Sequence, residues 1–221
     1  MRLPDCQFFL FGMGDRRKLL YRGGALLDAL TGETVRGWDV AWEHISPAEY
    51  AVEVETAEGA RVRIYEDEEG VWLDEGVGPE RLSTGEVHLP RWEGHPPGAL
   101  LRVLHQEMLV NIPGGRPVPN FLVYPRPWYR DAAMVCMCLA ETGNLHLVKE
   151  WVAGLREPFD RNNAGSREPD NLGQALYMIS LVSEASHPLV DAILDAAEDF
   201  RRGSHIAGIT DGAEHPVYQS K

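Results

Sequence analysis

The hydrophobic pattern of this chain changes its period near residue 99, and this change constrains the fold more than any other feature. Over residues 50–70, YAVEVETAEGARVRIYEDEEG, apolar and polar residues alternate, which is typical of antiparallel strands with one buried face and one Glu-rich face in water. From Ala99 onward the period is helical, as in ALLRVLHQEMLVNI. We therefore predict an α+β chain, with an antiparallel β-domain and linker over residues 1–98 and a helical domain over residues 99–221.

The first half reads as short strands joined by tight turns. Glycine-containing turn signals separate the apolar runs at Gly23-Gly24, Thr31-Gly32, Glu58-Gly59 and Glu69-Gly70. They predict a meander within about residues 8–75, followed over residues 76–98 by a proline-rich linker or irregular strap. We expect Trp38, Trp42 and Trp72 to lie in the core of this domain; the alternative is that they extend a platform for carbohydrate.

The second half predicts a repeated pair of helices. Helices are expected near 100–111, 130–142, 145–156, 171–184 and 188–202. The segments 132–140 and 172–182 are nearly free of polar residues, which predicts helices that are buried all round, whereas the helix after each has one apolar stripe. Met134, Cys138, Leu176 and Ile179 should then be inaccessible, and Lys149, Glu150 and Asp195 exposed. A helical hairpin repeated at about 40 residues is typical of a solenoid or toroid.

In such a repeat the two polar loops that precede the buried helices converge on one face. The first loop ends in Arg130-Asp131 and the second in Glu168-Pro169-Asp170-Asn171. A guanidinium donates several hydrogen bonds and carboxylates accept them, so the two loops predict a shared polar cleft. The alternatives stay open: an ion-paired, capped helix start at Arg130-Asp131, and helix capping by Asp170 or Asn171.

The stretch PRPWYRDAAM, a helical hairpin and then EPDNLGQALYMISL resemble the six-hairpin (α/α)-barrel glycosidases over roughly residues 100–205. The resemblance implies a helical toroid behind an N-terminal β-domain, and hydrolysis of a glycosidic bond with inversion. It implies Glu168 as general acid and Asp131 as a base or acceptor of sugar hydroxyls. The residues that it implies for substrate binding are Trp128, Tyr129, Arg130, Asp170, Asn171 and Gln174.

The chain offers fewer hairpins than a closed toroid requires. We therefore expect part of a toroid, as a fragment of a longer protein, as an incomplete ring, or as a homo-oligomer whose second copy covers the open flanks. Two other functions remain open, a non-catalytic carbohydrate-binding relative and a protein-interaction scaffold built from helical hairpins.

Net charge limits the classes of ligand that we expect, and cysteine content indicates the redox compartment. The formal net charge of −13 argues against nucleic acid and anionic membranes, and leaves a neutral oligosaccharide or glycoside as the expected ligand. Cys136 and Cys138 point to different faces of a helix, so with Cys6 they are expected to be free thiols of a reducing cytoplasm. We expect no metal, no cofactor, no secretory signal and no membrane span.

Overall fold

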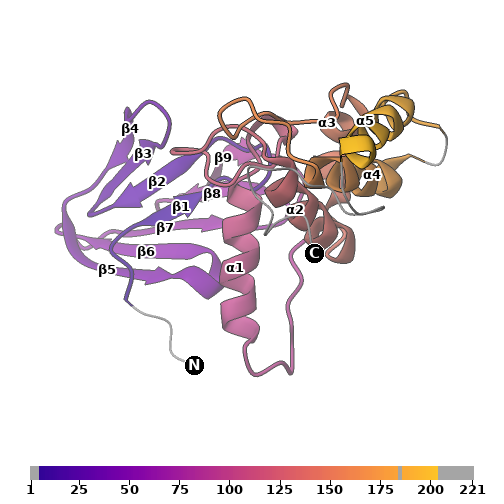
Figure 1. Cartoon of the computed structure of the whole chain (residues 1–221). Helices are drawn as coiled ribbons and strands as arrows, with labels where there is room; N and C mark the ends of the chain where they lie inside the picture. Colours follow the sequence, from indigo (N-terminus) through magenta and orange to yellow (C-terminus); the bar gives the residue numbers. More distant parts are fainter. Residues whose placement is uncertain (1–4, 184–185, 204–221) are drawn as a thin grey trace. The chain divides into compact units, whose positions relative to one another are not determined.

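The computed structural model describes residues 5–183 and 186–203 (Figure 1). The chain divides into two compact units, Met1–Gly114 and Gly115–Lys221. The first unit contains antiparallel sheets and one long helix, and the second contains helices. The predicted α+β class is therefore confirmed.

The first unit is built from two antiparallel sheets. One sheet has the strand order β1-β2-β3-β4 and the other β5-β6-β7-β8-β9, so strands that are neighbours in sequence pair with each other. The strands are β1 Phe9–Phe11, β2 Leu19–Arg22, β3 Ala25–Asp28, β4 Thr34–Gly37, β5 Val40–Ser46, β6 Ala51–Thr56, β7 Arg61–Glu66, β8 Gly70–Asp74 and β9 Pro79–Thr84. Strand β9 lies in the segment that was predicted to be a linker or an irregular strap, and that prediction was wrong for residues 79–84. Pro79 opens an edge strand, where a missing backbone N–H does not interrupt the ladder.

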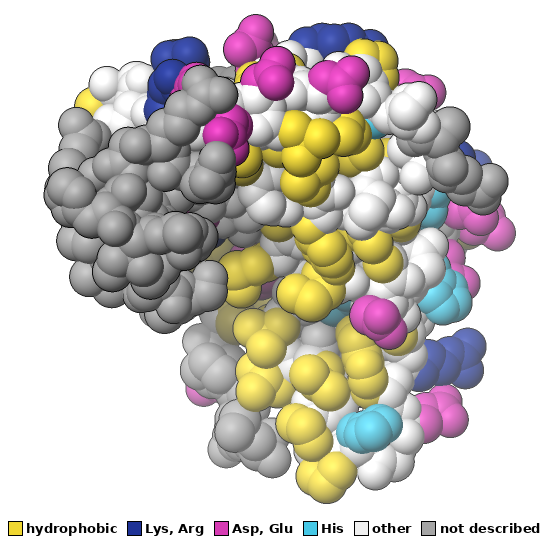
Figure 2. Space-filling model, turned by 45° about the vertical axis from the view of Figure 1, so that its right-hand side comes forward, with side chains coloured by type: hydrophobic (Ala, Val, Ile, Leu, Met, Phe, Trp, Pro, Cys, Tyr) yellow, Lys and Arg dark blue, Asp and Glu magenta, His cyan; other side chains and the backbone are white. Residues whose placement is uncertain are grey.

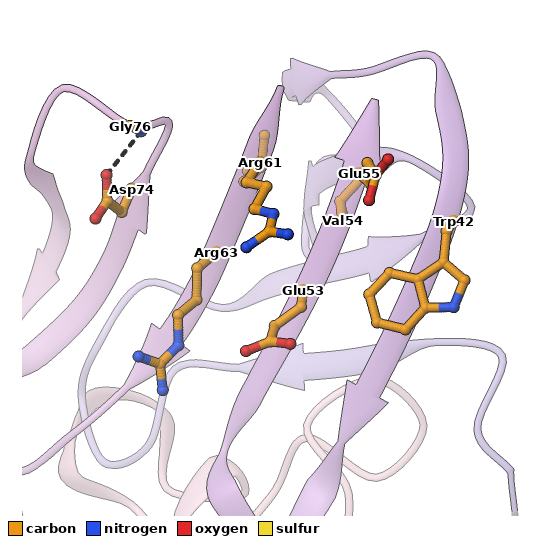
Figure 3. Close-up of a pocket in the computed structure, with 9 residues that line it drawn as sticks. Trp42, Glu53, Val54, Glu55, Arg61, Arg63, Asp74 and Gly76 are labelled. Atoms are coloured by element: carbon orange, nitrogen blue, oxygen red, sulfur yellow. Dashed lines mark hydrogen bonds between the residues drawn. The ribbon is translucent and has the colours of Figure 1, made fainter. Parts of the chain in front are cut away.

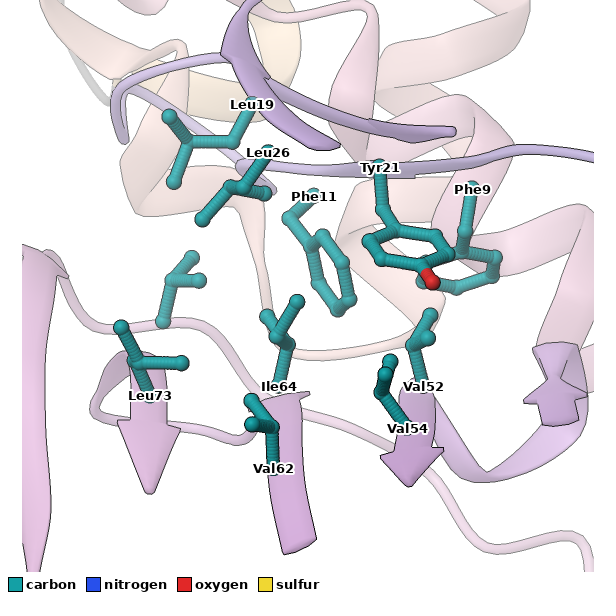
Figure 4. Close-up of a cluster of buried hydrophobic side chains, with 11 residues drawn as sticks. Phe9, Phe11, Leu19, Tyr21, Leu26, Val52, Val54, Val62, Ile64 and Leu73 are labelled. Carbon is teal, nitrogen blue, oxygen red and sulfur yellow. The ribbon is translucent and has the colours of Figure 1, made fainter. Parts of the chain in front are cut away.

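The core of this unit lies between the two sheets (Figure 4). Aromatic and aliphatic side chains of β1, β2 and β3 point toward those of β6, β7 and β8. Alternation places Val52, Val54, Val62 and Ile64 in this core, while Glu53 and Arg63 on the same strands are exposed. The period of two in the sequence therefore gave the correct buried face.

The three tryptophans of the β-unit do not share one environment. Trp38 packs partly buried against the core and donates its indole N–H to Glu75 at 2.7 Å. Trp72 is half-buried on the outer face of the sheet and is stacked on Tyr65, so its predicted place in the core was wrong. Trp42 is 52% exposed, so its predicted place in the core was wrong. A register shift in the β5–β6 pairing between Val40 and Trp42 changes the alternation at this position.

A buried ionic cluster fixes the loop between β1 and β2. Glu66, at the end of β7, accepts hydrogen bonds from the backbone N–H groups of Gly12 and Met13 at 2.9 and 2.7 Å. Its carboxylate also pairs with the guanidinium of Arg16 at 2.9 Å, and neither side chain has exposed surface. Lys18 donates to the carbonyls of Gly12 and Gly14, and burial lowers its pKa to about 8. We call Gly12, Met13, Arg16, Lys18 and Glu66 the Glu66 cluster.

Helix α1 (Gly98–Val110) belongs to the first unit. Gln106 donates to the carbonyl of Leu10 at 2.9 Å, and Arg102 donates to the carbonyl of Ala48 in the short helix η1 (Pro47–Glu49) at 2.9 Å. The contacts therefore group α1 with the sheets, whereas the sequence analysis placed it with the helical hairpins.

After η2 (Pro113–Gly115), the second unit contains α2 (Tyr129–Glu141), η3 (Leu145–Leu147), α3 (Lys149–Ala153), α4 (Asp170–Val182) and α5 (Leu189–Gly203). Helix α4 packs against α2, α3 and α5. The helix predicted over 145–156 is broken into η3 and α3 at Val148, where φ is −118°. Nowhere in residues 5–183 and 186–203 does a helix combine the length and apolar character needed to cross a membrane.

Helix α2 is buried on one side only. Tyr129, Ala132, Ala133, Cys136 and Leu139 form its buried stripe. Met134 is 63% exposed, Met137 is 48% exposed and Cys138 is exposed, so the prediction of burial all round was wrong for this helix. On α4, Ile179 is buried as predicted but Leu176 is only half-buried, whereas Lys149, Glu150 and Asp195 are exposed as predicted. Figure 2 shows hydrophobic side chains exposed on the face of the molecule that it presents.

Candidate functional site

The starts of α2 and α4 bring together four of the residues that the sequence analysis selected. The Arg130 guanidinium lies 3.6 Å from the Glu168 carboxylate and 3.8 Å from that of Asp170. Its central carbon is 5.5 Å from the centre of the Trp128 ring. We call Trp128, Arg130, Glu168 and Asp170 the Arg130 cluster. It joins a cation, two carboxylates and an aromatic face, all within the second unit.

Glu168 is the most unusual member of this cluster. Its side chain is only 8% exposed. One carboxylate oxygen, Oε1, accepts a hydrogen bond from the Asn163 amide at 3.4 Å. The other, Oε2, is buried without a hydrogen-bond partner among the described residues. A buried acceptor without a partner costs about 1–3 kcal/mol, so this oxygen is well suited to accept a hydrogen bond from a ligand.

Asp160 holds the start of α2 and was missed by the sequence analysis as a site residue. Its carboxylate accepts hydrogen bonds from the backbone N–H of Tyr129 at 2.7 Å and from that of Asn162 at 2.8 Å. A carboxylate at this place satisfies an otherwise unpaired helix N–H and interacts favourably with the helix dipole. The bond to Asn162 forms an Asx turn, and the run Asp160-Arg161-Asn162-Asn163 is a signal that could have indicated such a turn.

The loop between α3 and α4 contains a backbone conformation that residues other than glycine rarely adopt. Arg161 and Ala164 have φ values of 56° and 50°, in the left-handed region. Such residues persist where the surroundings fix them. Here the Asn162 amide donates to the carbonyl of Pro127 at 2.7 Å, which anchors the loop to the segment before α2. Two hydrogen bonds, from the Tyr129 N–H to Asp160 and from Asn162 to the Pro127 carbonyl, therefore fix the loop that supplies Glu168.

Asn171 and Gln174 form hydrogen bonds with residues in and beside the Arg130 cluster. Asn171 has no exposed surface; its amide oxygen accepts from the backbone N–H of Asp160 at 3.1 Å and its amide nitrogen donates to Gln174 at 3.2 Å. Gln174 in turn donates to the Asp170 carboxylate at 3.0 Å. These bonds position Asp160 and Asp170. The N-cap residue of α4 is Pro169, and Asp170 is the first residue of the helix rather than its cap.

The two aromatic residues before Arg130 lie in different environments. Tyr129 is 6% exposed, and its hydroxyl donates to the carbonyl of Glu157 at 2.8 Å. Burial raises the pKa of Tyr129 to about 12. Trp128 is half-exposed, which makes it the ring available for stacking on a ligand. Asp131 lies in the first turn of α2 and is half-buried, and its predicted place in one cleft with Glu168 stays a prediction.

The chemistry of the cluster is that of hydrogen bonding to a polar ligand. Among the residues that the structure describes, no group of three or more His, Cys, Asp or Glu side chains could hold a metal ion. The chain matches no protein-family model, no curated protein and no solved structure, so the Arg130 cluster itself is the basis for any assignment.

Proposed function

We propose that this chain acts on carbohydrates, and that the Arg130 cluster binds a sugar unit of a neutral oligosaccharide or glycoside. In this proposal the helices of the second unit are part of an α/α toroid, and the site lies at the end where its inner helices α2 and α4 begin. The activity is hydrolysis of a glycosidic bond with inversion.

The observation that carries the proposal is the buried carboxylate of Glu168, which keeps one oxygen without a partner among the described residues. A purely structural ion pair would satisfy both oxygens, because an unsatisfied buried charge destabilises the fold. A sugar hydroxyl is a donor of suitable size and charge for this oxygen. The half-exposed Trp128 ring supplies an apolar face for the pyranose, and the Arg130 fork supplies donors.

Hydrolysis with inversion needs a second carboxyl group. One carboxylic acid protonates the leaving oxygen, and a carboxylate about 6.5–9.5 Å away activates water. We assign Glu168 as the acid, which in this role donates a proton from Oε2 to the leaving oxygen instead of accepting a hydrogen bond there. Asp131, in the first turn of α2, is assigned as the base or hydroxyl acceptor.

A non-catalytic carbohydrate-binding protein is the second candidate. It is favoured by one observation: Arg130 lies within ion-pair distance of both Glu168 and Asp170. A guanidinium beside both carboxylates suits tight binding of hydroxyls. In this alternative the same residues bind the sugar without cleaving it.

Turnover and binding by the Glu168→Gln variant separate the two candidates. A panel of neutral hexasaccharides is incubated with the full chain, and the anomeric configuration of new reducing ends is followed by NMR. For an enzyme, Glu168→Gln abolishes product formation while the affinity measured by calorimetry is kept, because the amide keeps the shape but cannot donate a proton as an acid. Asp131→Ala weakens binding, since a hydroxyl acceptor is lost.

Glu150→Gln is the matched control, because Glu150 is an exposed glutamate of α3 and should change neither quantity. Binding without product in the native chain supports the second candidate. If Arg130→Ala binds every sugar as well as the native chain does, or if no sugar in the panel binds, the proposed site is wrong.

A further inference from the structure

The outer face of the five-stranded sheet in the first unit carries a hollow that the Arg130 cluster does not use. Its volume is about 710 Å³, within the range of about 300–1,000 Å³ that is typical of small-molecule sites. It runs across β5, β6, β7 and β8 rather than along an edge strand, so it is not a place where a peptide would add a strand. Figure 3 shows the residues that line it.

Charged side chains of both signs stand on this face. The register of β6 and β7 places Glu53 opposite Arg63 and Glu55 opposite Arg61. Asp74 on β8 lies opposite Arg63 and accepts a hydrogen bond from the backbone N–H of Gly76 at 2.8 Å. With three carboxylates and two guanidinium groups the charges nearly balance, so the lining favours neither an anion nor a cation.

These facing groups do not pair with each other. Opposite charges directly across a sheet stabilise it when they meet, by about 0.2–1 kcal/mol. In the part of the chain that the structure describes, no ion pair within 4.0 Å joins Glu53 to Arg63 or Glu55 to Arg61. Arg63 instead lies over the Tyr65 ring, 5.0 Å from its centre. The facing carboxylates and guanidinium groups of β6 and β7 are therefore not bound to each other across the sheet.

An exposed indole flanks the charged rows. Trp42 on β5 is 52% exposed, lines the hollow and lies opposite Glu55 in the register. Its ring is stacked on that of His44, with 6.0 Å between the ring centres. The part of the indole that stays exposed beside hydrogen-bonding side chains suits a flat ring that is apolar on its faces and polar at its edges. A pyranose has this character, and its hydroxyls donate and accept, as a lining of mixed sign requires.

We infer that this hollow, which we call the sheet-face groove, is a second binding site whose ligand is a neutral oligosaccharide. Trp42 stacks on one sugar ring, Arg61 and Arg63 donate to hydroxyls, and Glu53 and Glu55 accept from them. The inference goes beyond the proposed function, because the groove lies in the other unit and uses none of the same residues.

The indole N–H resonance of Trp42 tests the groove in the full-length chain. The resonance is assigned by its disappearance in Trp42→Phe, and neutral hexasaccharides built from glucose, xylose and mannose are titrated at millimolar concentration. We expect a saturable shift with at least one of them. Arg61→Ala and, independently, Glu53→Ala should raise the Kd read from this resonance by about tenfold, as truncation of a central contact commonly does.

The matched control is Arg126→Ala, which removes an exposed arginine of the second unit and should leave this Kd unchanged. Because the ligand is neutral, the Kd should vary little with salt. The groove proposal is overturned if the resonance does not move with any of the sugars, or moves only with inorganic phosphate or a sulfated sugar.

The two sites can fail separately. If Arg130→Ala loses sugar turnover while the Trp42 shift persists, both assignments stand. If sugar is turned over but the Trp42 chemical shift does not change, the Arg130 cluster remains the proposed site and the sheet-face groove proposal is rejected. If sugar changes the Trp42 chemical shift but Arg130→Ala does not change sugar binding, the sheet-face groove proposal remains and the proposed function of the Arg130 cluster is rejected.

Discussion

Arg130 and Glu168 lie 3.6 Å apart although they belong to the starts of different helical segments. The glutamate side chain is 8% exposed and the arginine side chain 32% exposed, so the pair sits at the boundary between core and solvent. This pairing joins the two loops that the sequence analysis expected to converge, and it makes Arg130 the most informative residue to change.

Replacement of Arg130 by alanine should weaken both stability and sugar binding. Glu168 would keep a buried charge without its cation, which we expect to lower the free energy of unfolding by about 1–3 kcal/mol. Arg130→Lys should recover most of the stability but less of the binding, because an ammonium lacks the planar fork. Urea denaturation and calorimetry measure the two effects, and equal binding by the Lys and native forms would contradict the role of the fork.

The Asp160 carboxylate should stabilise the fold through its hydrogen bond at the start of α2. Asp160→Ala removes the acceptor of the Tyr129 N–H, and we expect the free energy of unfolding to fall by about 1–2 kcal/mol. Asp160→Asn keeps an acceptor oxygen and should lose less than half of that. A loss in Asp160→Asn as large as in Asp160→Ala would show that charge, rather than the hydrogen bond, is decisive.

The Glu66 cluster should be the most sensitive part of the first unit. Glu66→Gln leaves the buried Arg16 guanidinium without its carboxylate, and we expect a loss of about 3–5 kcal/mol in the free energy of unfolding. Glu69→Gln is the control, because its pair with Arg81 is exposed on both sides and should change stability by less than about 0.5 kcal/mol. Similar effects of the two variants on denaturation midpoints would rule out the buried cluster.

His105 should make the stability depend on pH in the acidic range. Burial lowers the pKa of His105 from 6.5 to about 4. Between these values the unfolded chain binds more protons than the folded chain, so the contribution of His105 is complete above pH 6.5 and is lost as pH falls toward 4. The slope is at most about 1.4 kcal/mol per pH unit.

Carboxyl groups also titrate in this range, so the measurement compares variants. The difference in unfolding free energy between the native chain and His105→Gln should fall as pH is lowered across that window. The exposed His146 is the control, and His146→Gln should track the native chain. A difference that is constant with pH would exclude a neutral buried imidazole.

The reactivity of the three cysteine thiols tests which face of α2 is buried. Cys6 and Cys138 are exposed and Cys136 is buried, where burial raises the pKa of its thiol to about 12. A thiol reagent should therefore modify Cys6 and Cys138 in the folded chain and Cys136 only after denaturation. Cys138→Ser should remove one fast-reacting thiol, whereas rapid modification of Cys136 would mean that the buried face of α2 has been misassigned.

Sequence reasoning succeeded where the pattern carried two signals at once. In β6 and β7, Val52, Val54, Val62 and Ile64 alternate with charged residues, so both the strand type and the buried face could be predicted. On α2 the stretch 132–140 is apolar throughout, so nothing in the sequence distinguishes the side that α4 covers from the side that carries Met134. The helix was predicted correctly and its exposed face was not.

The candidate site shows the same limit. Arg130, Glu168 and Asp170 could be selected because the sequence predicts a helical repeat, and such a repeat would bring equivalent loops to one face. Asp160 could not be placed, because its bond to the Tyr129 N–H depends on how the loop before α4 folds back toward α2. The sheet-face groove depends on registers between strands, such as Glu55 opposite Trp42, which alternation alone does not specify.

The Glu66 cluster also has a consequence for how the chain folds. Glu66 and the backbone of Gly12 are separated by 54 residues, and the N–H groups of Gly12 and Met13 meet their carboxylate acceptor only when the end of β7 is in place. Closing so long a loop is slow, and folds dominated by distant contacts reach their native state later than helical hairpins do. We therefore expect the helices of the second unit to form first during refolding, and the ordering of the β1–β2 loop to be a late, rate-limiting event in the first unit.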